Sequence, residues 1–114
     1  MSKDFVPEIG SQELKQLLDR GESVLLLDVR EPEENQLVAI KPSVLIPLME
    51  LETKLEDVRK LTEGKQHLVA YCRVGGRSEM AVQYLEASGV LGVKNLRGGI
   101  NAYAEEADTS LNPY

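Results

Sequence analysis

The sequence is poor in residues that bind metals or form disulfides. Its 114 residues contain one cysteine, one histidine and no tryptophan. One cysteine excludes an intramolecular disulfide and a paired-cysteine metal or redox site. We therefore expect no metal and no other cofactor. A lone reactive thiol suits a reducing compartment, so a cytoplasmic location is expected.

Long apolar runs are also absent. None approaches the roughly 18 residues that a membrane span needs, and Met1 to Phe5 lack the apolar core of a signal peptide. We expect no membrane partner. The formal net charge of −6 gives no support to nucleic-acid binding. The length suits one domain over residues 1–114 and is too short for two.

The one cysteine, Cys72, lies between an apolar run and a glycine-rich loop. The run Leu68–Tyr71 predicts a buried strand that ends at the cysteine. The two glycines that follow allow backbone conformations that other residues resist. Ser78 is expected to cap a helix over residues 79–88. The pattern therefore predicts a thiol at a strand end, above a tight loop and facing the start of a helix.

Positive charge surrounds this predicted thiol. Inward-pointing N–H groups and a helix dipole of about half a charge favour a thiolate, and Arg73 and Arg77 add two full charges. A cysteine in such surroundings can titrate well below its free value of roughly 8.5. The alternative is a small buried hydrophobe, but a packing cysteine has no use for these neighbours. Cys72 is the candidate catalytic residue, and the candidate substrate-binding residues are Arg73, Val74, Gly75, Gly76, Arg77 and Ser78.

The segment Cys72–Ser78, Cys-Arg-Val-Gly-Gly-Arg-Ser, resembles the active-site loop of the rhodanese family of sulfurtransferases. Four residues separate Cys72 from Arg77, whereas cell-cycle-type cysteine phosphatases place five there. The resemblance implies a loop that fits around one sulfur bonded to cysteine, a persulfide. The serine at position 78 argues against phosphate ester chemistry.

A second segment, Asp28-Val-Arg-Glu-Pro-Glu-Glu34, resembles the family signature Asp-Val-Arg-x-x-x-Glu. Charged residues at the carboxyl end of a parallel strand usually lie near the ligand crevice. Asp28 and Arg30 are therefore candidate supporting residues, with Arg30 reaching toward the cysteine loop. The alternative is structural: the two side chains pair with each other or cap turns.

Three further segments match the family pattern to different degrees. Val38–Ser43 lacks the Gly-His turn that the family commonly has there. The sequence does not determine how this absence changes the backbone at residues 38–39. Ser43–Leu48 is similar to the variant in rhodanese domains attached to E1-like adenylating enzymes, which serve sulfur-carrier and molybdopterin pathways. The segment Leu96–Tyr103 resembles the family's closing signature, and we interpret it as backbone turn and packing.

Apolar periodicity predicts strands that alternate with helices. Strands are expected at 5–9, 23–29, 44–46, 68–71 and 93–96. Helices are expected from an N-cap at Ser11 to about residue 20, from Pro47 to beyond Leu61, at 79–88 and from 97 past 103. This order predicts an α/β domain with a central, mainly parallel sheet and helices on both faces. The resemblance implies the rhodanese-like three-layer fold, with a core of about 9–103 and an irregular tail at 108–114.

The single histidine, His67, begins the strand that ends at Cys72. A strand rises about 3.3 Å per residue, so His67 should lie roughly 16 Å from the thiol. This distance excludes a Cys–His catalytic pair and favours activation of the thiol by the loop and the helix dipole.

The resemblance implies a sulfurtransferase that moves a sulfane sulfur through a Cys72 persulfide. Its donor would be thiosulfate or a protein persulfide, and its acceptor a thiol or a sulfur-carrier protein. Two alternatives remain. A non-catalytic interaction or regulatory module is disfavoured by the intact loop, and a cysteine-dependent phosphatase or arsenate reductase is disfavoured by the loop's length.

Overall fold

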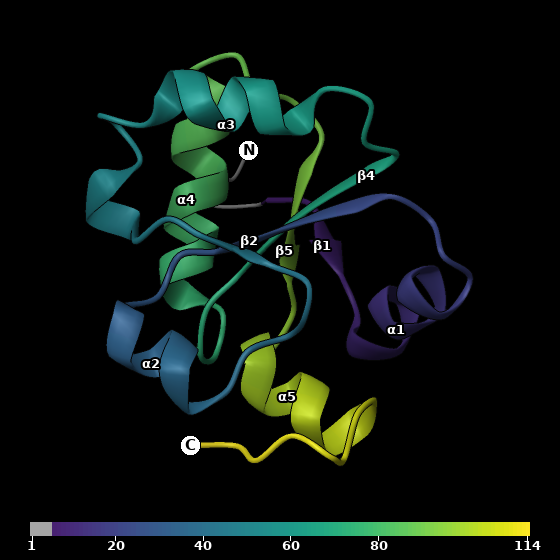
Figure 1. Ribbon diagram of the computed structural model, residues 1–114. Coiled ribbons are helices and arrows are strands. Elements are labelled where there is room, and N and C mark those ends of the chain that lie inside the picture. Colours follow the sequence, from purple (N-terminus) through teal and green to yellow (C-terminus); the bar gives the residue numbers. More distant parts are fainter. Residues whose placement is uncertain (1–5) are drawn as a thin grey trace.

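Five parallel strands form one sheet in the order β1-β5-β4-β2-β3 (Figure 1). The computed structural model describes residues 6–114, in which the strands are β1 (Glu8–Ile9), β2 (Val24–Asp28), β3 (Val44–Leu45), β4 (His67–Tyr71) and β5 (Val93–Leu96). The strand expected at 5–9 is shorter, and Phe5 lies outside the described residues. The predicted parallel sheet is confirmed, with β4 at its centre.

Helices cover both faces of this sheet (Figure 1). They are α1 (Ser11–Asp19), α2 (Pro32–Leu37), the 3-10 helix η1 (Leu48–Glu50), α3 (Leu55–Thr62), α4 (Gly76–Ala87) and α5 (Gly99–Glu106). One apolar cluster joins α3 and α4 to the sheet through Val58, Leu85, Leu27 and Ala70. The other joins α1 and α5 through Leu14, Ile100, Leu26 and Val69. The three-layer α/β fold is therefore confirmed.

The two central strands end level with each other. Asp28 of β2 pairs with Tyr71 of β4, and Cys72 follows directly. Side chains alternate across the sheet, so Tyr71 belongs to the α1–α5 cluster and Cys72 to the α3–α4 cluster. Parallel strands carry their ligand sites at their carboxyl ends, and this edge brings together the segments after β2 and β4.

The start of α4 differs from the prediction. The helix begins at Gly76 with Gly75 as its N-cap, and Gly75 has φ of +116°, which only glycine adopts readily. Ser78 is therefore wrong as the cap, and it lies inside the first turn. Because α4 starts earlier than predicted, its first residues are themselves part of the cysteine loop.

The predicted helix from Pro47 to beyond Leu61 is also wrong as one element. The chain makes one turn of 3-10 helix at η1, and α3 begins only after Lys54, whose backbone (φ −110°, ψ 19°) is not helical. The apolar residues are spaced as in one long helix because Leu48 packs against the same apolar cluster as Val58. Apolar residues at helical spacing can therefore be buried together without belonging to one continuous helix.

Two further helix starts depart from the sequence interpretation. The N-cap of α1 is Gly10 and not Ser11, because the Glu13 side chain accepts the Gly10 N–H at 3.2 Å. Helix α2 was not predicted. Its signals were present: Pro32 occupies the first turn, and the Glu34 carboxylate accepts the N–H of the cap residue Glu31 at 3.0 Å.

Within residues 6–114, no helix has both the length and the apolar character needed to cross a membrane. The tail at 108–114 forms no helix or strand, as expected. It nevertheless returns to the carboxyl ends of the central strands, where Cys72 lies, and the Tyr114 side chain makes hydrogen bonds there.

Candidate active site

The sulfur of Cys72 lies at the amino terminus of α4. The residue is 1% exposed, and its Sγ accepts the N–H of Gly75 at 3.1 Å and the N–H of Ser78 at 3.4 Å. The first turn of a helix has N–H groups without intrahelical partners, and its dipole is positive there. The site therefore stabilises negative charge on this sulfur through the backbone.

A buried side chain from β5 holds this loop in place. Asn95 donates from Nδ2 to the carbonyl of Gly75 at 3.2 Å, and its Oδ1 accepts the Ser78 hydroxyl at 2.5 Å. The Ser78 hydroxyl also lies 3.3 Å from Sγ, but it has a single hydrogen. The shortest contact of the hydroxyl is to Asn95, so its hydrogen is directed there and not to the sulfur. The two backbone N–H groups are therefore the donors to Sγ. Nothing in the sequence around Asn95 distinguishes it from the other residues of β5, so it was not among the predicted site residues.

The start of α5 supports the loop from behind. The N–H groups of Ile100 and Asn101 donate to the carbonyls of Cys72 and Arg73 at 2.9 and 3.1 Å. Gly99, with φ of +65°, passes so close that an added Cβ would lie 2.3 Å from the Arg73 oxygen. The interpretation of this segment as turn and packing agrees with these contacts.

The two loop arginines both have partners outside the loop. Arg77 binds the Glu34 carboxylate with two hydrogen bonds, at 2.7 and 2.9 Å, and its guanidinium holds the pKa of Glu34 well below the usual range. Arg73 is exposed, its guanidinium lies 5.0 Å from the Tyr114 ring centroid, and it donates to the Tyr114 main-chain oxygen. Glu34 was noted from the sequence only as the last residue of the 28–34 signature, without a role in the site, and Tyr114 was not singled out.

The remaining loop residues form its outer surface. Val74 is 63% exposed at the tip. An added Cβ on Gly76 would meet no atom within 4 Å, so Gly76 faces open space. The structure thus places Gly75 and Ser78 against the sulfur, while the side chains of Arg73 and Arg77 contact partners outside the loop. Val74 and Gly76 lie on its outer surface.

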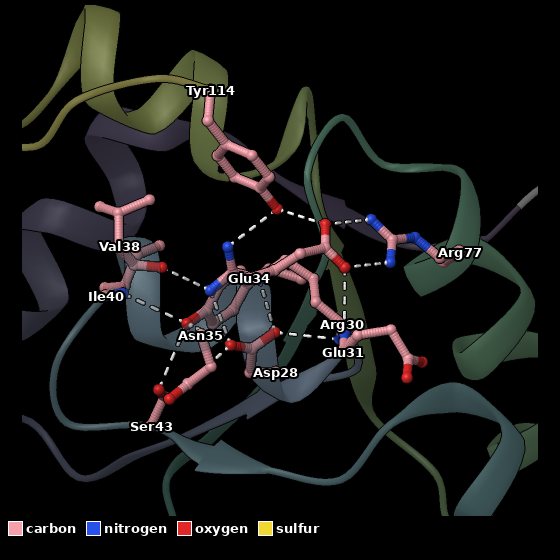
Figure 2. A network of polar contacts seen from close by, with 11 residues as sticks. Asp28, Arg30, Glu31, Glu34, Asn35, Val38, Ile40, Ser43, Arg77 and Tyr114 are labelled. Atoms are coloured by element: carbon pink, nitrogen blue, oxygen red, sulfur yellow. Dashed lines mark hydrogen bonds and ion pairs between the residues drawn. The ribbon is translucent and has the colours of Figure 1, made fainter.

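Asp28 and Arg30 pair with each other below this loop (Figure 2). Both side chains are fully buried, and two hydrogen bonds of 2.8 Å join the guanidinium to the carboxylate. Arg30 also donates to the carbonyl of Val38 at 2.7 Å. It therefore ties the 38–39 turn, where the family's Gly-His is missing, to the end of β2.

This buried pair does not touch the cysteine. Among residues 6–114, no hydrogen bond joins Asp28 or Arg30 to Cys72 or its loop. The connection is indirect: Arg30 donates to the Tyr114 hydroxyl at 2.9 Å, and that hydroxyl donates to Glu34 at 2.5 Å (Figure 2). The mutual pairing is one of the two alternatives that the sequence left open.

The histidine lies at the other end of β4. His67 begins this strand and Cys72 follows its last residue. The His67 Nε2 lies 2.7 Å from the Glu22 carboxylate, and this contact is the largest cause of the lowered pKa of Glu22. The imidazole is therefore engaged away from the thiol, as its sequence position indicated.

Comparison with known proteins gives this arrangement a family. The model of the rhodanese-like domain matches residues 11–106. A sulfurtransferase of Allochromatium vinosum is 38% identical over 88% of this chain and 90% of its own length. The maize adenylyltransferase and sulfurtransferase MOCS3-2 is 38% identical over 99% of this chain. The chain spans about a quarter of the length of this larger relative, 25%.

Solved structures agree with the sequence relatives. The human single-domain sulfurtransferase TSTD1 superimposes with a TM-score of 0.73 at 29% identity, over 90% of this chain and 98% of its own. A Bacillus anthracis structure named CoADR-RHD gives a TM-score of 0.78 at 32% identity, over 93% of this chain and 18% of its own. The three-layer fold therefore recurs in free-standing chains and inside longer ones.

Proposed function

The chain belongs to the family of rhodanese-like domains, and we propose that it is a sulfurtransferase that carries a sulfane sulfur on Cys72. The observation that carries the proposal is the position of Sγ, which accepts two backbone N–H groups from the amino terminus of α4. Relatives named as sulfurtransferases support the same reaction class.

The proposed reaction has two halves. The Cys72 thiolate attacks the outer sulfur of the donor, a new S–S bond forms, and the donor's own S–S bond breaks. The leaving group takes the electron pair and departs as sulfite from thiosulfate, or as a thiolate from a persulfide. An acceptor nucleophile then attacks the outer sulfur, and the Cys72 thiolate leaves. This is covalent catalysis in ping-pong order, without net oxidation.

The loop has N–H groups to spare for the transferred sulfur. Gly75 and Ser78 use theirs on Sγ, and those of Gly76 and Arg77 lie between them in the first turn of α4, where N–H groups have no intrahelical partner. We assign these two groups to the outer sulfur of the persulfide, where they act as an oxyanion hole acts on oxygen.

Burial of the thiol restricts the shape of the donor. Cys72 is 1% exposed, so a donor must present a projecting terminal sulfur, as thiosulfate and persulfides do. A bulkier phosphate ester fits this constraint less well. We propose a thiol or a sulfur-carrier protein as the acceptor. The support is that the maize relative is named as both an adenylyltransferase and a sulfurtransferase, two activities that the sequence analysis linked to sulfur-carrier pathways.

The test is the intact mass of the protein after incubation with thiosulfate, and separately with a cysteine-desulfurase persulfide donor. We expect a gain of one sulfur atom that cyanide removes and that Cys72→Ser lacks, with an unchanged circular dichroism spectrum. No gain from either donor would favour a non-catalytic module. Turnover of an aryl phosphate that depends on Cys72 would instead favour a phosphatase.

A further inference from the structure

Tyr114 lies against one of the two loop arginines. The Arg73 guanidinium carbon is 5.0 Å from the centroid of the Tyr114 ring, within the range of a cation–π contact. The same guanidinium donates to the main-chain oxygen of Tyr114. One residue of the tail therefore covers part of the exposed Arg73 side chain with both its ring and its backbone.

Three further hydrogen bonds anchor Tyr114 in this position, and Figure 2 shows the two that its hydroxyl makes. Its hydroxyl accepts from Arg30 at 2.9 Å and donates to Glu34 at 2.5 Å. A hydroxyl has one hydrogen and two lone pairs, so both bonds form together. The Tyr114 N–H donates to the Asn101 side chain at 3.1 Å. The cover over Arg73 is thus fixed to the fold at the hydroxyl and at the backbone.

The two loop arginines differ in charge balance. Arg77 is neutralised by the two-bond pair with Glu34. Among residues 6–114, Arg73 forms no ion pair with an acidic side chain. It is therefore the loop cation without an acidic side-chain partner, and it is also the one that Tyr114 contacts. An acidic chain of net charge −6 offers an anion little other attraction.

We propose that Tyr114 is a specificity-determining residue that disfavours small oxyanionic donors, such as thiosulfate, relative to persulfide donors. This inference rests on the function proposed above. Thiosulfate carries a sulfonate that must find a cation while its outer sulfur is transferred and sulfite departs. Arg73 is exposed, but one face of its guanidinium and one of its N–H groups are engaged by Tyr114, so a sulfonate must compete with Tyr114 for them. A persulfide transfers its outer sulfur and departs as a thiolate without a sulfonate to place, so it does not enter this competition.

The experiment measures the second-order rate constant for loading Cys72 with sulfur, using thiosulfate and cysteine persulfide as separate donors. We expect Tyr114→Ala to raise the constant for thiosulfate about tenfold, which corresponds to about 1.4 kcal/mol. The rate constant for cysteine persulfide should change less than about twofold, which is the change expected of a substitution without a specific effect. Tyr114→Phe keeps the ring but loses both hydroxyl bonds, so its effect on thiosulfate should lie between.

A double-mutant cycle tests the route through Arg73. In an Arg73→Ala background, Tyr114→Ala should no longer change the constant for thiosulfate. The proposal is overturned if the gain persists without Arg73, if Tyr114→Ala leaves thiosulfate loading unchanged, or if both donors change by the same factor. An equal loss for both donors is the result that a purely structural tail residue would give.

A matched substitution within the tail controls for general disturbance. In the described part of the chain the Ser110 hydroxyl bonds only to Asp108, so Ser110→Ala should leave both constants unchanged. Failure of the two proposals looks different. If the wild type accepts sulfur from neither donor, the proposed function is wrong and this inference with it. If the wild type is loaded but Tyr114→Ala shows no donor selectivity, only the role of Tyr114 is wrong.

Discussion

The main-chain N–H of Ile100 donates to the carbonyl of Cys72 at 2.9 Å. This bond joins the first turn of α5 to the residue that we propose as the nucleophile. A second bond, from Asn101 to Arg73, lies beside it. The position of the sulfur is therefore set by a helix distant in sequence as well as by the loop itself.

Gly99 is the residue that permits this close approach, so Gly99→Ala should displace the cysteine loop. The new Cβ would lie 2.3 Å from the Arg73 oxygen and 2.6 Å from the Cys72 oxygen, and neither backbone atom can move without carrying the nucleophile. A displacement of about 1 Å can cost roughly 100-fold in rate. We expect a loss of at least about tenfold in the rate of Cys72 loading, measured by mass spectrometry on protein shown to be folded.

A second glycine separates the clash from backbone strain. Gly92 also has positive φ, +88°, but an added Cβ there would meet no atom within 4 Å. Gly92→Ala should therefore cost about 1–2 kcal/mol of stability from the left-handed conformation and leave loading of the folded protein intact. Equal loss of loading in both variants would mean that the Gly99 contact does not position the loop.

The sequence was sufficient for the elements that follow a local rule. The run 68–71 predicted β4, the alternation of strands and helices predicted the parallel sheet, and the position of His67 kept it apart from Cys72. It was insufficient for partners brought together only by folding. Asn95, Glu34 and Tyr114 contact the loop from three separate segments. The signature at 28–34 includes Glu34 but does not reveal its partner Arg77, and no local pattern marks Asn95 or Tyr114.

The buried pair of Asp28 and Arg30 should matter for stability more than for chemistry. Both side chains are fully buried, so Asp28→Asn would leave a guanidinium without its counter-charge. Breaking such a pair costs about 3–5 kcal/mol. We expect that loss in urea unfolding, together with normal Cys72 loading by the fraction that remains folded, because within residues 6–114 no hydrogen bond joins Asp28 to the loop.

An exposed ion pair provides the control for this substitution. Asp19 pairs with Lys15 at 2.8 Å, but its side chain is 60% exposed. Asp19→Asn should change the free energy of unfolding by less than about 1 kcal/mol. If folded Asp28→Asn protein failed to take up sulfur, the pair would have a role in the site, and the indirect connection through Tyr114 and Glu34 would be the route to examine.

The pair of Glu34 and Arg77 predicts a specific pH dependence. The Arg77 guanidinium and, to a lesser extent, the Tyr114 hydroxyl lower the pKa of Glu34 in the folded protein. In the unfolded chain this carboxyl titrates near its ordinary value of about 4.3. A lowered folded pKa stabilises the protein above about pH 4.3, and this contribution is lost as the pH falls below that value. Glu34→Gln should therefore be less stable than wild type at pH 7, with a difference that narrows below about pH 4.3.

Urea unfolding of four proteins at about pH 7, 5 and 3.5 spans this window and isolates the pair. These are wild type, Glu34→Gln, Arg77→Gln and the double variant. The coupling between the two substitutions should be largest at pH 7, nearly unchanged at pH 5 and smaller at pH 3.5, because below about pH 4.3 Glu34 takes up a proton in the unfolded chain, and that proton must be released before the pair can form. Both side chains are partly exposed, Glu34 at 19% and Arg77 at 36%, so solvent weakens the coupling without changing its sign. A coupling that grew as the pH fell would mean that the two side chains do not form this ion pair in solution, and Arg77 would then be free for a donor anion.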